Sequence, residues 1–338
     1  MSVLGTTTSQ WLSPAENSLL VRSSRNKVAI MSYKWTTALN SLQSYLSEQG
    51  YTPVFISLQQ NVGVLNFEGA GFTVQGTTHS FSDFVCCYGG ITNNDSWSKN
   101  YLETLLKIFA GHGVTSLDSF KGVQMTNYKQ IMMRLFKREG IPTPDFFICN
   151  GYTPAWCLER ILDQFSDKVA IKHNGSRGRN VQIRSLDKLG VLAETLNQHR
   201  APNSQFINKK LVIQQYISSK DKNNYTHHYR ILVINGKILA SIKYTAADTK
   251  LLKSTYIHGS PSKCLQAIDP DKILSEENKE MVIRACKAMG IRLAGVDVIF
   301  TKDKMYILEV NNAPGDIYPE IFGHNRLLEE TVNYIRTL

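Results

Sequence analysis

The first third of the chain alternates between short apolar runs and segments in which apolar residues recur at helical spacing. After the first run, Trp35, Leu39, Leu42 and Leu46 follow at intervals of four, three and four residues, which places them on one face of a helix that Gly50 closes. A second helix is predicted at about 99–110. Buried strands are predicted at three apolar runs: 27–33, 51–58 and 83–90. This alternation predicts a small α/β domain with a parallel sheet.

The pattern changes after residue 120, where strands come in neighbouring pairs with helices between them. An amphipathic helix is predicted over 128–139, and the turn Ile-Pro-Thr-Pro follows it. Its inward face is predicted to hold Ile131, Met132, Leu135 and Phe136. The Asn235-Gly236 pair predicts a hairpin over 230–242, and a second hairpin is predicted over 296–311. Further elements are predicted at 169–183 (two strands around a glycine loop), 211–217 (a strand) and 276–289 (a helix). Antiparallel pairs favour an α+β arrangement in this part.

The boundary near residue 120 also divides the charge. The formal net charge is +10; residues 1–120 hold 6 Lys and Arg against 7 Asp and Glu, whereas residues 121–338 hold 32 against 21. A basic C-terminal part favours an anionic partner, which could be a nucleic acid, a membrane surface, a nucleotide or an acidic substrate. Charge alone does not choose among them.

Composition limits the class of protein further. Of the 338 residues, 42% are hydrophobic and 20% are charged, a balance that excludes a mainly disordered, collagen-like or coiled-coil chain. No window approaches the ~18–20 uninterrupted apolar residues of a membrane span, and the first twenty residues lack the features of a secretory signal. The six cysteines include no C-x-x-C pair and no zinc spacing. We therefore expect a soluble, cytoplasmic protein with reduced thiols.

Three oxygen-bearing side chains stand in the predicted C-terminal hairpin. Glu309 and Asn311 are two residues apart on one strand and therefore face the same side. Asp297 joins them only if it lies opposite Glu309, which follows from a three-residue loop with Thr301 opposite Met305. Oxygen ligands of this kind, completed by water and phosphate, suit Mg²⁺. Singly, such residues are common on a solvent-facing hairpin, but together at this spacing they favour a metal site.

Lys172 ends an apolar strand and is followed by a glycine-bearing loop at 175–178. Glycines allow such a loop to fold its backbone N–H groups around phosphate oxygens, although most loops of this composition are ordinary turns. Lys129, Arg230 and Lys253 are isolated cations, and taken singly each is more often solvated. A lysine suits a terminal phosphate, whereas an arginine suits a carboxylate or an acyl phosphate. Motifs of covalent hydrolases, zinc peptidases and kinases are missing from the sequence.

From about Gly122 to the C-terminus these motifs resemble, in the same order, those of the ATP-grasp carboxylate–amine ligases, and most closely the RimK-like branch of glutamate and peptide ligases. The resemblance rests on four segments: MTNYKQIMMRLFKREGIPTPDFF, VAIKHNGSRGRNVQI, LVIQQYI, and AGVDVIF with YILEVNNAPG. The E-V-N-x-x-P-G run is the most specific of them. The region before Gly122 is more weakly similar to the pre-ATP-grasp domain.

The resemblance implies a role for individual residues. The implied nucleotide-binding residues are Lys129, Lys172, Gly175, Ser176, Gly178, Gln215, Tyr216, Ile217, His228 and Lys253. The implied catalytic residues are Arg230, Lys253 and Lys172, and the implied magnesium ligands are Asp297, Glu309 and Asn311. The sequence departs from the branch at Gln215, which replaces a glutamate, at His228, which replaces an acidic residue after an insertion, and at Thr255, which replaces an asparagine.

The implied fold is α/β plus α+β, that is, an ATP-grasp fold with an N-terminal parallel-sheet domain. Its expected parts are a loose leader at 1–26, a pre-ATP-grasp domain at 27–120, a central subdomain with a glycine-rich lid at 121–208, and a C-terminal subdomain with the magnesium site at 209–338.

The implied reaction is ATP-dependent formation of an amide between a carboxylate, activated as an acyl phosphate, and an amine. ATP and Mg²⁺ are the expected cofactors, with two ions in the site and Mn²⁺ as a substitute. The expected substrates are an amino acid, a peptide or a protein tail, and the family also implies a homodimer. Two alternatives stay open: a non-catalytic Mg·ATP-binding regulatory module and, less favoured, a basic nucleic-acid-binding protein.

Overall fold

The computed structural model describes residues 25–33, 37–59, 66–89, 96–126, 128–149, 160, 163–165, 168–173, 182–185, 211–219, 221, 223, 225–246, 263–312 and 325–338. The predicted leader lies outside these residues except for its last two positions. So do Gly175, Ser176, Gly178 and Lys253.

The N-terminal part contains a parallel sheet, as predicted. Its strands are β1 (Lys27–Ser32), β2 (Thr52–Ser57), β6 (Phe84–Gly89) and β7 (Thr115–Ser116). Their order is β2-β1-β6-β7, with every pair parallel. Helices α2 (Thr37–Glu48) and α3 (Ser96–Gly111) provide crossover connections, and they bury the leucines that the helical spacing selects.

A small antiparallel sheet between β2 and β6 was not predicted. It consists of β3 (Asn66–Glu68), β4 (Gly71–Val74) and β5 (Thr77–Ser80), and the short 3-10 helix η1 (Phe81–Asp83) follows it. Gln75 and Gly76 join β4 to β5 with φ values of 50° and 76°, a turn of the type that favours hairpins. The ring of Phe72 packs against Phe84 and Phe109, at centroid distances of 5.5 and 5.3 Å. This packing anchors the three-stranded sheet to the domain core.

The second part begins with two helices, α4 (Phe120–Thr126) and α5 (Lys129–Arg138). An antiparallel sheet follows, in the order β10-β9-β11-β8. Its strands are β8 (Phe146–Cys149), β9 (Lys168–His173), β10 (Gln182–Ser185) and β11 (Leu211–Gln215). The predicted inward face of α5 is wrong at one position, because Ile131 is 43% exposed whereas Met132, Met133 and Phe136 are buried. The buried face of α5 is therefore rotated by one position from the predicted face, and Lys129 lies on it as well.

A five-stranded antiparallel sheet forms the largest layer, in the order β14-β13-β12-β15-β16. Its strands are β12 (Thr226–Ile234), β13 (Lys237–Ala246), β14 (Lys263–Ile268), β15 (Leu293–Phe300) and β16 (Met305–Asn312). The predicted hairpin at Asn235-Gly236 is confirmed, since both residues have positive φ. The short helix η4 (Pro270–Lys272) precedes α8 (Glu276–Met289), whose N-cap is Ser275 and whose C-cap is Gly290. The buried face of α8 centres on Val282, Ala285, Cys286 and Met289.

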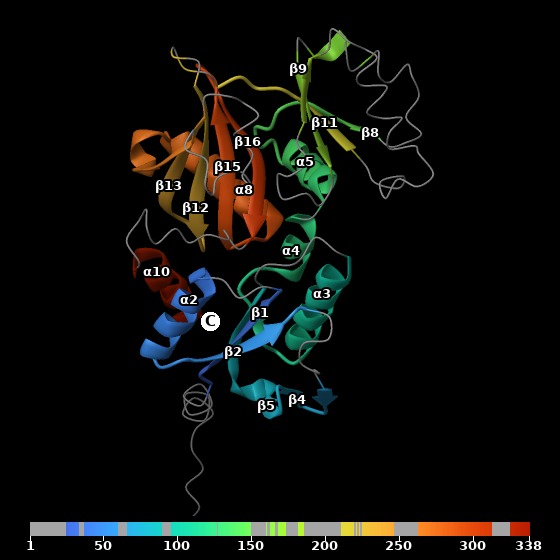
Figure 1. The fold of residues 1–338 in the computed structure, drawn as a ribbon, viewed down its shortest axis with the longest axis vertical. Coiled ribbons are helices and arrows are strands. Elements are labelled where there is room, and N and C mark those ends of the chain that lie inside the picture. The colour runs from blue at the N-terminus through green and yellow to red at the C-terminus, as the bar shows by residue number, and fades with distance from the viewer. Residues whose placement is uncertain are drawn as a thin grey trace, which may run out of the picture.

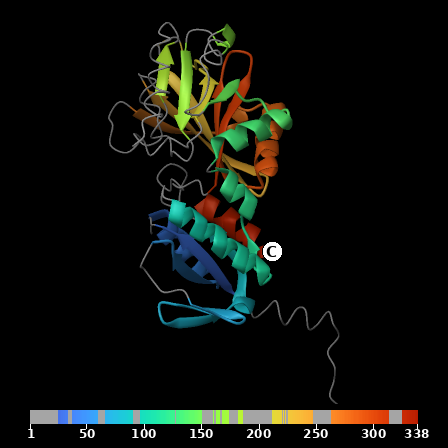
Figure 2. The same ribbon diagram turned by 90° about the vertical axis from the view of Figure 1, so that its right-hand side faces the viewer.

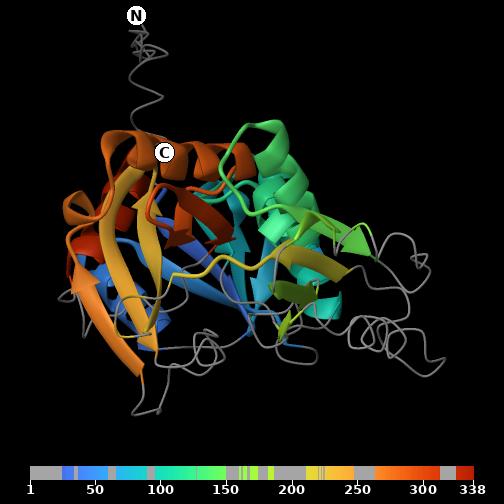
Figure 3. The same ribbon diagram turned by 90° about the horizontal axis from the view of Figure 1, so that it is seen from above.

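These layers assemble into two blocks. The parallel sheet with α2 and α3 lies below, and the two antiparallel sheets lie side by side above it (Figures 1 and 3). The last helix, α10 (Asn325–Arg336), returns from the upper block to lie beside α2 (Figures 1 and 2). Arg336 of α10 donates a hydrogen bond to the side chain of Gln49, and Tyr334 donates one to the carbonyl of Leu117.

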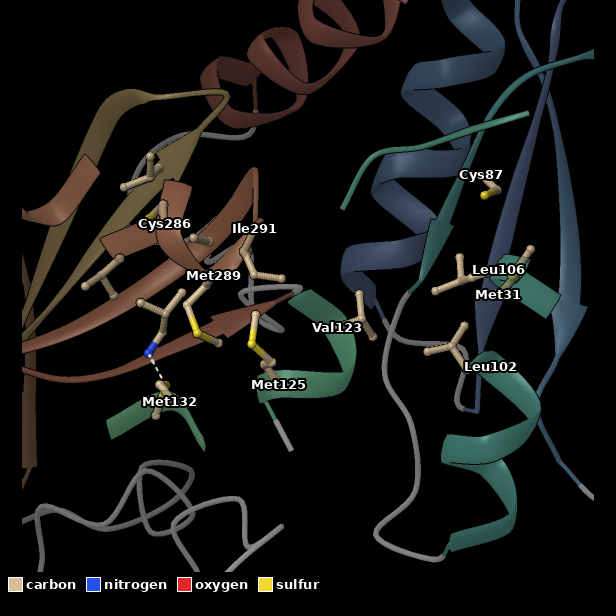
Figure 4. Packing of buried hydrophobic residues seen from close by; sticks show 14 of the residues in the cluster. Met31, Cys87, Leu102, Leu106, Val123, Met125, Met132, Cys286, Met289 and Ile291 are labelled. Atoms are coloured by element: carbon tan, nitrogen blue, oxygen red, sulfur yellow. Dashed lines mark hydrogen bonds between the residues drawn. The ribbon is translucent and has the colours of Figure 1, made fainter. Parts of the chain in front are cut away.

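One hydrophobic core crosses from the lower block to the upper one. Figure 4 shows it running from Met31 and Leu102 through Val123 of α4 to Met289 and Ile291. The four-stranded antiparallel sheet has a separate, smaller core of its own. The large sheet and the parallel sheet are therefore joined by packing, and the four-stranded sheet (the small sheet below) contacts the same core through Val212 and Phe146.

Beside the shared core, residues 117–122 lie in close contact with residues 289–293, and this contact is called the joint below. A Cβ atom added to Gly122 would lie 2.5 Å from the carbonyl oxygen of Met289. Asp118, which is fully buried, accepts hydrogen bonds from the backbone N–H groups of Arg292 and Leu293 through Oδ1. Its Oδ2 has no hydrogen-bond partner among the residues that the structure describes.

Candidate functional site

The β15–β16 hairpin brings Asp297 opposite Glu309 by a different register from the predicted one. Phe300, not Thr301, pairs with Met305, so the connection has one residue more than expected. A regular ladder from that turn would place Asp297 opposite Leu308 and turn Glu309 to the other face. The register shifts between Asp297 and Val298, and this β-bulge restores the predicted pairing.

Asp297, Glu309 and Asn311 meet on one face of the large sheet. The Asn311 amide nitrogen donates hydrogen bonds to Oδ2 of Asp297, at 3.3 Å, and to Oε1 of Glu309, at 3.1 Å. Two carboxylates and an amide therefore converge within hydrogen-bond distance of a common point. These hydrogen bonds exclude the alternative that the three residues are unconnected polar side chains on a solvent-facing hairpin.

Each carboxylate is paired with a cation. Arg230, on the neighbouring strand β12, donates from Nε and Nη2 to the two oxygens of Asp297, at 2.7 and 2.9 Å. The ammonium group of Lys129, at the start of α5, contacts Glu309. Burial raises the pKa of Glu309, but the charges of Lys129 and Lys172 outweigh this effect and lower the pKa to about 2. Glu309 is therefore ionised at neutral pH.

Lys172 reaches the same place from the small sheet. Its side chain is buried, and no described residue accepts a hydrogen bond from its ammonium group. Burial and the nearby charge of Lys129 lower its pKa to about 8, against the opposing effect of Glu309 and Asp297. A buried cation that pairs directly with none of the described residues is poised for an anionic ligand.

The charges in the site sum to an excess of one positive charge, because three cations (Lys129, Lys172 and Arg230) face two carboxylates. The donor set of the carboxylates and the amide of Asn311 consists of oxygens once the amide is turned, as Mg²⁺ requires. A metal ion that displaced Lys129 and Arg230 from the carboxylates would leave these cations facing phosphate oxygens. The residues present therefore fit Mg²⁺ together with a polyphosphate.

The residues implied to hold adenine lie at the end of β11 and just after it. Gln215, Tyr216 and Ile217 are partly exposed, and the Gln215 N–H donates to the carbonyl of Asp145 at 2.7 Å. His228 lies two positions before Arg230 on β12 and therefore on the same face. Its ring stacks on Tyr244, with centroids 4.3 Å apart and planes inclined by 2°. The predicted residues within the described chain thus line two sheets and one helix that face each other.

Contacts between α4–α5 and the edge of β16 were missed by the sequence analysis. Thr126 Oγ1 donates to Oδ1 of Asn312 at 3.0 Å, and the Val310 N–H donates to the sulfur of Met132 at 3.4 Å. No local signal could have identified these pairs, because their members lie more than 170 residues apart in sequence.

Two further features lie away from this site. A surface groove of about 970 Å³ is lined by α8, α10, η4 and the start of β13, and none of the candidate residues contributes to it. Among the described residues, no helix is both long enough and apolar enough to span a membrane.

The structure is similar to solved ATP-grasp ligases. The ATP-grasp ligase PsnB, complexed with a minimal precursor, matches 92% of this chain and 99% of its own with a TM-score of 0.67 at 15% identity. The macrocyclase MdnC from Microcystis aeruginosa, bound with its precursor peptide MdnA, matches 92% of this chain and all of its own with a TM-score of 0.65 at 13% identity. These likenesses establish the fold.

Sequence comparison places the chain more closely. A probable alpha-L-glutamate ligase of Haemophilus influenzae (strain PittEE) is 26% identical over 234 residues, which is 69% of this chain and 71% of the relative. The tetrahydromethanopterin:alpha-L-glutamate ligase of Methanocaldococcus jannaschii is 22% identical over 279 residues, 79% of this chain and 87% of the relative. The family model for the RimK-like ATP-grasp domain matches residues 126–321.

The fold and the site define an ATP-grasp carboxylate–amine ligase. Within that class, the chain belongs to the RimK-like ATP-grasp family. The predicted fold class and the predicted class of enzyme are thereby confirmed.

Proposed function

We propose that this protein uses Mg·ATP to join the carboxylate of one amino acid or peptide to the amine of another, and that the residues gathered where the two antiparallel sheets meet carry the reaction. The observation that carries the proposal is the convergence of Asp297, Glu309, Asn311, Lys129 and Lys172 from four elements on one point. The names of the glutamate-ligase relatives and of the peptide-bound neighbours support this substrate class.

In this proposal Asp297, Glu309 and Asn311 hold Mg²⁺, with one or two ions in the site. The ion would supply positive charge beside the phosphates. Lys129 and Lys172 bind phosphate oxygens and stabilise the charge that spreads over the transferred group. The donor carboxylate attacks the γ-phosphate to give an acyl phosphate and ADP, so the substrate itself supplies the nucleophile.

Arg230 is proposed to hold the donor carboxylate or the acyl phosphate. Its guanidinium already binds a carboxylate through two hydrogen bonds, which is the geometry that this role requires. The loop with Gly175, Ser176 and Gly178 is proposed to cover the phosphates, and Lys253 to bind them. Gln215, Tyr216, Ile217 and His228 are proposed to hold the adenosine.

The amine acceptor is proposed to enter from the parallel sheet. Ligands of open α/β sheets bind beyond the carboxyl ends of the strands, where neighbouring connections diverge. Here β1 lies between β2 and β6, so the divergence falls at β1. The carboxyl end of β7 leads directly into the joint at 117–122, and this edge of the sheet therefore faces the upper block.

The test is ADP release with Mg·ATP in the presence of pools of amino acids and peptides, divided until donor and acceptor are known. Glu309→Ala serves as the blank, and Glu330→Ala, which removes only the surface partner of Lys237, serves as the matched control. We expect pool-dependent release that Glu309→Ala lowers by at least about 100-fold and Glu330→Ala leaves intact. Binding of Mg·ATP without release from any pool would instead support a regulatory nucleotide-binding module.

A further inference from the structure

The segment from α4 to the Ile-Pro-Thr-Pro turn lies along the free edge of β16. Four contacts join the two: Thr126 with Asn312, Lys129 with Glu309, Met132 with Val310, and Pro142 with Ile307. The strand that carries two proposed metal ligands is therefore fastened at several points to the helix that carries the proposed phosphate lysine.

Two of these contacts flank the bulge that aims Glu309. On one side of Leu308 the Ile307 N–H donates to the carbonyl of Pro142 at 2.7 Å. On the other side the Val310 N–H donates to the sulfur of Met132 at 3.4 Å, the hydrogen bond drawn at Met132 in Figure 4. Both donors point outward from a strand at the edge of its sheet, where no strand among the described residues pairs with them.

The Val310 N–H needs an acceptor because it is buried. Val310 is 1% exposed and Met132 is 1% exposed, so water does not reach the pair. A buried N–H without a partner is strongly unfavourable, and the strand could avoid that cost by shifting its register. A shift by one residue would turn Glu309 and Asn311 to the opposite face of the sheet.

We propose that Met132 is a positioning residue for the metal site: its sulfur holds Val310, and with it the bulge that directs Glu309 and Asn311 toward Asp297. The inference rests on the proposed function, since it concerns the same metal site. It differs from simple core filling, in which the methionine would contribute volume and its sulfur would contribute nothing to the geometry.

The experiment compares Met132→Leu with Met125→Leu. Leucine conserves the apolar volume but removes the sulfur acceptor, a change that cores tolerate well. Met125 is buried in the same core cluster, and no described residue donates a hydrogen bond to its sulfur. Mn²⁺ binding in the presence of ADP is measured by electron paramagnetic resonance of the free ion, and amide hydrogen exchange is measured at Val310.

We expect Met132→Leu to raise the dissociation constant of Mn²⁺ about three- to tenfold and to accelerate exchange at Val310, whereas Met125→Leu changes both by less than about twofold. Equal effects of the two substitutions, or unchanged Mn²⁺ affinity in Met132→Leu, would overturn the proposal. Rapid exchange of the Val310 amide in the unsubstituted protein would also overturn it, without need of any variant. Glu309→Ala distinguishes failure of the Met132 proposal from failure of the proposed metal site. Unchanged Mn²⁺ affinity in that variant would refute the metal site itself.

Discussion

The two antiparallel sheets that face each other across the site differ in how they are held. The large sheet shares a core with the parallel sheet through α4, α5 and α8, whereas the small sheet contacts that core through Val212 and Phe146. On its other face the described residues of the small sheet form a separate cluster, made of Cys149, Phe165, Val169, Ile171, Leu211 and Ile213. Regions with little buried apolar surface open at a lower free-energy cost than the rest of a protein. We therefore expect the small sheet, which carries the proposed phosphate lysine Lys172, to be the softer of the two, and the large sheet, which carries the proposed metal ligands, to be the firmer.

This difference suits an enzyme that must admit a nucleotide and then enclose it. The metal ligands require a fixed geometry, and the bulged hairpin, the edge contacts of β16 and the joint at Gly122 all supply it. Lys172 has to approach the phosphates after they bind, so its attachment to a lightly held sheet allows that approach.

The largest expected effect comes from a matched pair of core substitutions. Ile231 of the large sheet and Ile171 of the small sheet are both fully buried, and replacing either by alanine should cost about 2–5 kcal/mol. Ile231→Ala should lower the free energy of unfolding of the whole shared core. Ile171→Ala should mainly accelerate amide exchange in β8, β9 and β11. Equal acceleration in both blocks by Ile171→Ala would refute the proposed difference.

The joint offers the next test. An added Cβ at Gly122 would lie 2.5 and 2.8 Å from the carbonyl oxygens of Met289 and Gly290, so Gly122→Ala should destabilise the shared core by about 3 kcal/mol. Gly111, at the end of α3, has open space around it. Gly111→Ala should therefore be neutral or stabilising by up to about 1 kcal/mol. Urea denaturation measures both, and a small effect at Gly122 would show that the joint yields easily.

The pH dependence of nucleotide binding tests the role of Lys172 on the small sheet. The pKa of Lys172 is lowered to about 8, so the free protein loses this charge as the pH rises through 8. ATP binding favours the charged form, and the affinity should fall by up to about tenfold between pH 8 and pH 9. Lys172→Arg keeps the charge and should flatten this dependence, whereas Lys168→Arg on the same strand should not. Calorimetric titrations at several pH values decide, and identical profiles for both variants would contradict the expectation.

The smallest effect concerns Asp118 in the joint. Burial raises its pKa to about 6, against the hydrogen bonds from Leu293 and Arg292, whereas the unfolded carboxyl keeps a value near 3.8. The folded state therefore binds more protons between pH 4 and pH 6, and this group stabilises the protein as the pH falls through that range. Between pH 7 and pH 5 the gain should be about 1 kcal/mol. Asp118→Asn should abolish it, as urea denaturation at the two pH values would show.

The sequence predicted the faces of strands well and the registers poorly. Asp297 opposite Glu309 is confirmed, yet the expected pairing of Thr301 with Met305 is wrong, and the bulge reconciles the two. The bulge lies between contacts of β16 with Met132 and Pro142, which are far away in sequence, so no local pattern indicates these contacts.

Local periodicity failed where tertiary packing decides which face is buried. Ile131 has the spacing of an inward residue, but Met133 takes that place, where its sulfur accepts hydrogen bonds from Thr143 and Gln214. The three-stranded sheet at 66–80 was not predicted, although the Gln75-Gly76 pair is a usable turn signal. The position of α10 against α2 depends on the whole fold and could not be read from either segment alone.

That position of α10 has a consequence for synthesis on the ribosome. One face of the parallel sheet and of α2 is covered by Leu328, Val332 and Ile335 of α10, so the parallel-sheet domain keeps an uncovered apolar surface until α10 has left the exit tunnel. Folding of this domain cannot be completed in the usual vectorial order, and the nascent chain has to be shielded until α10 emerges.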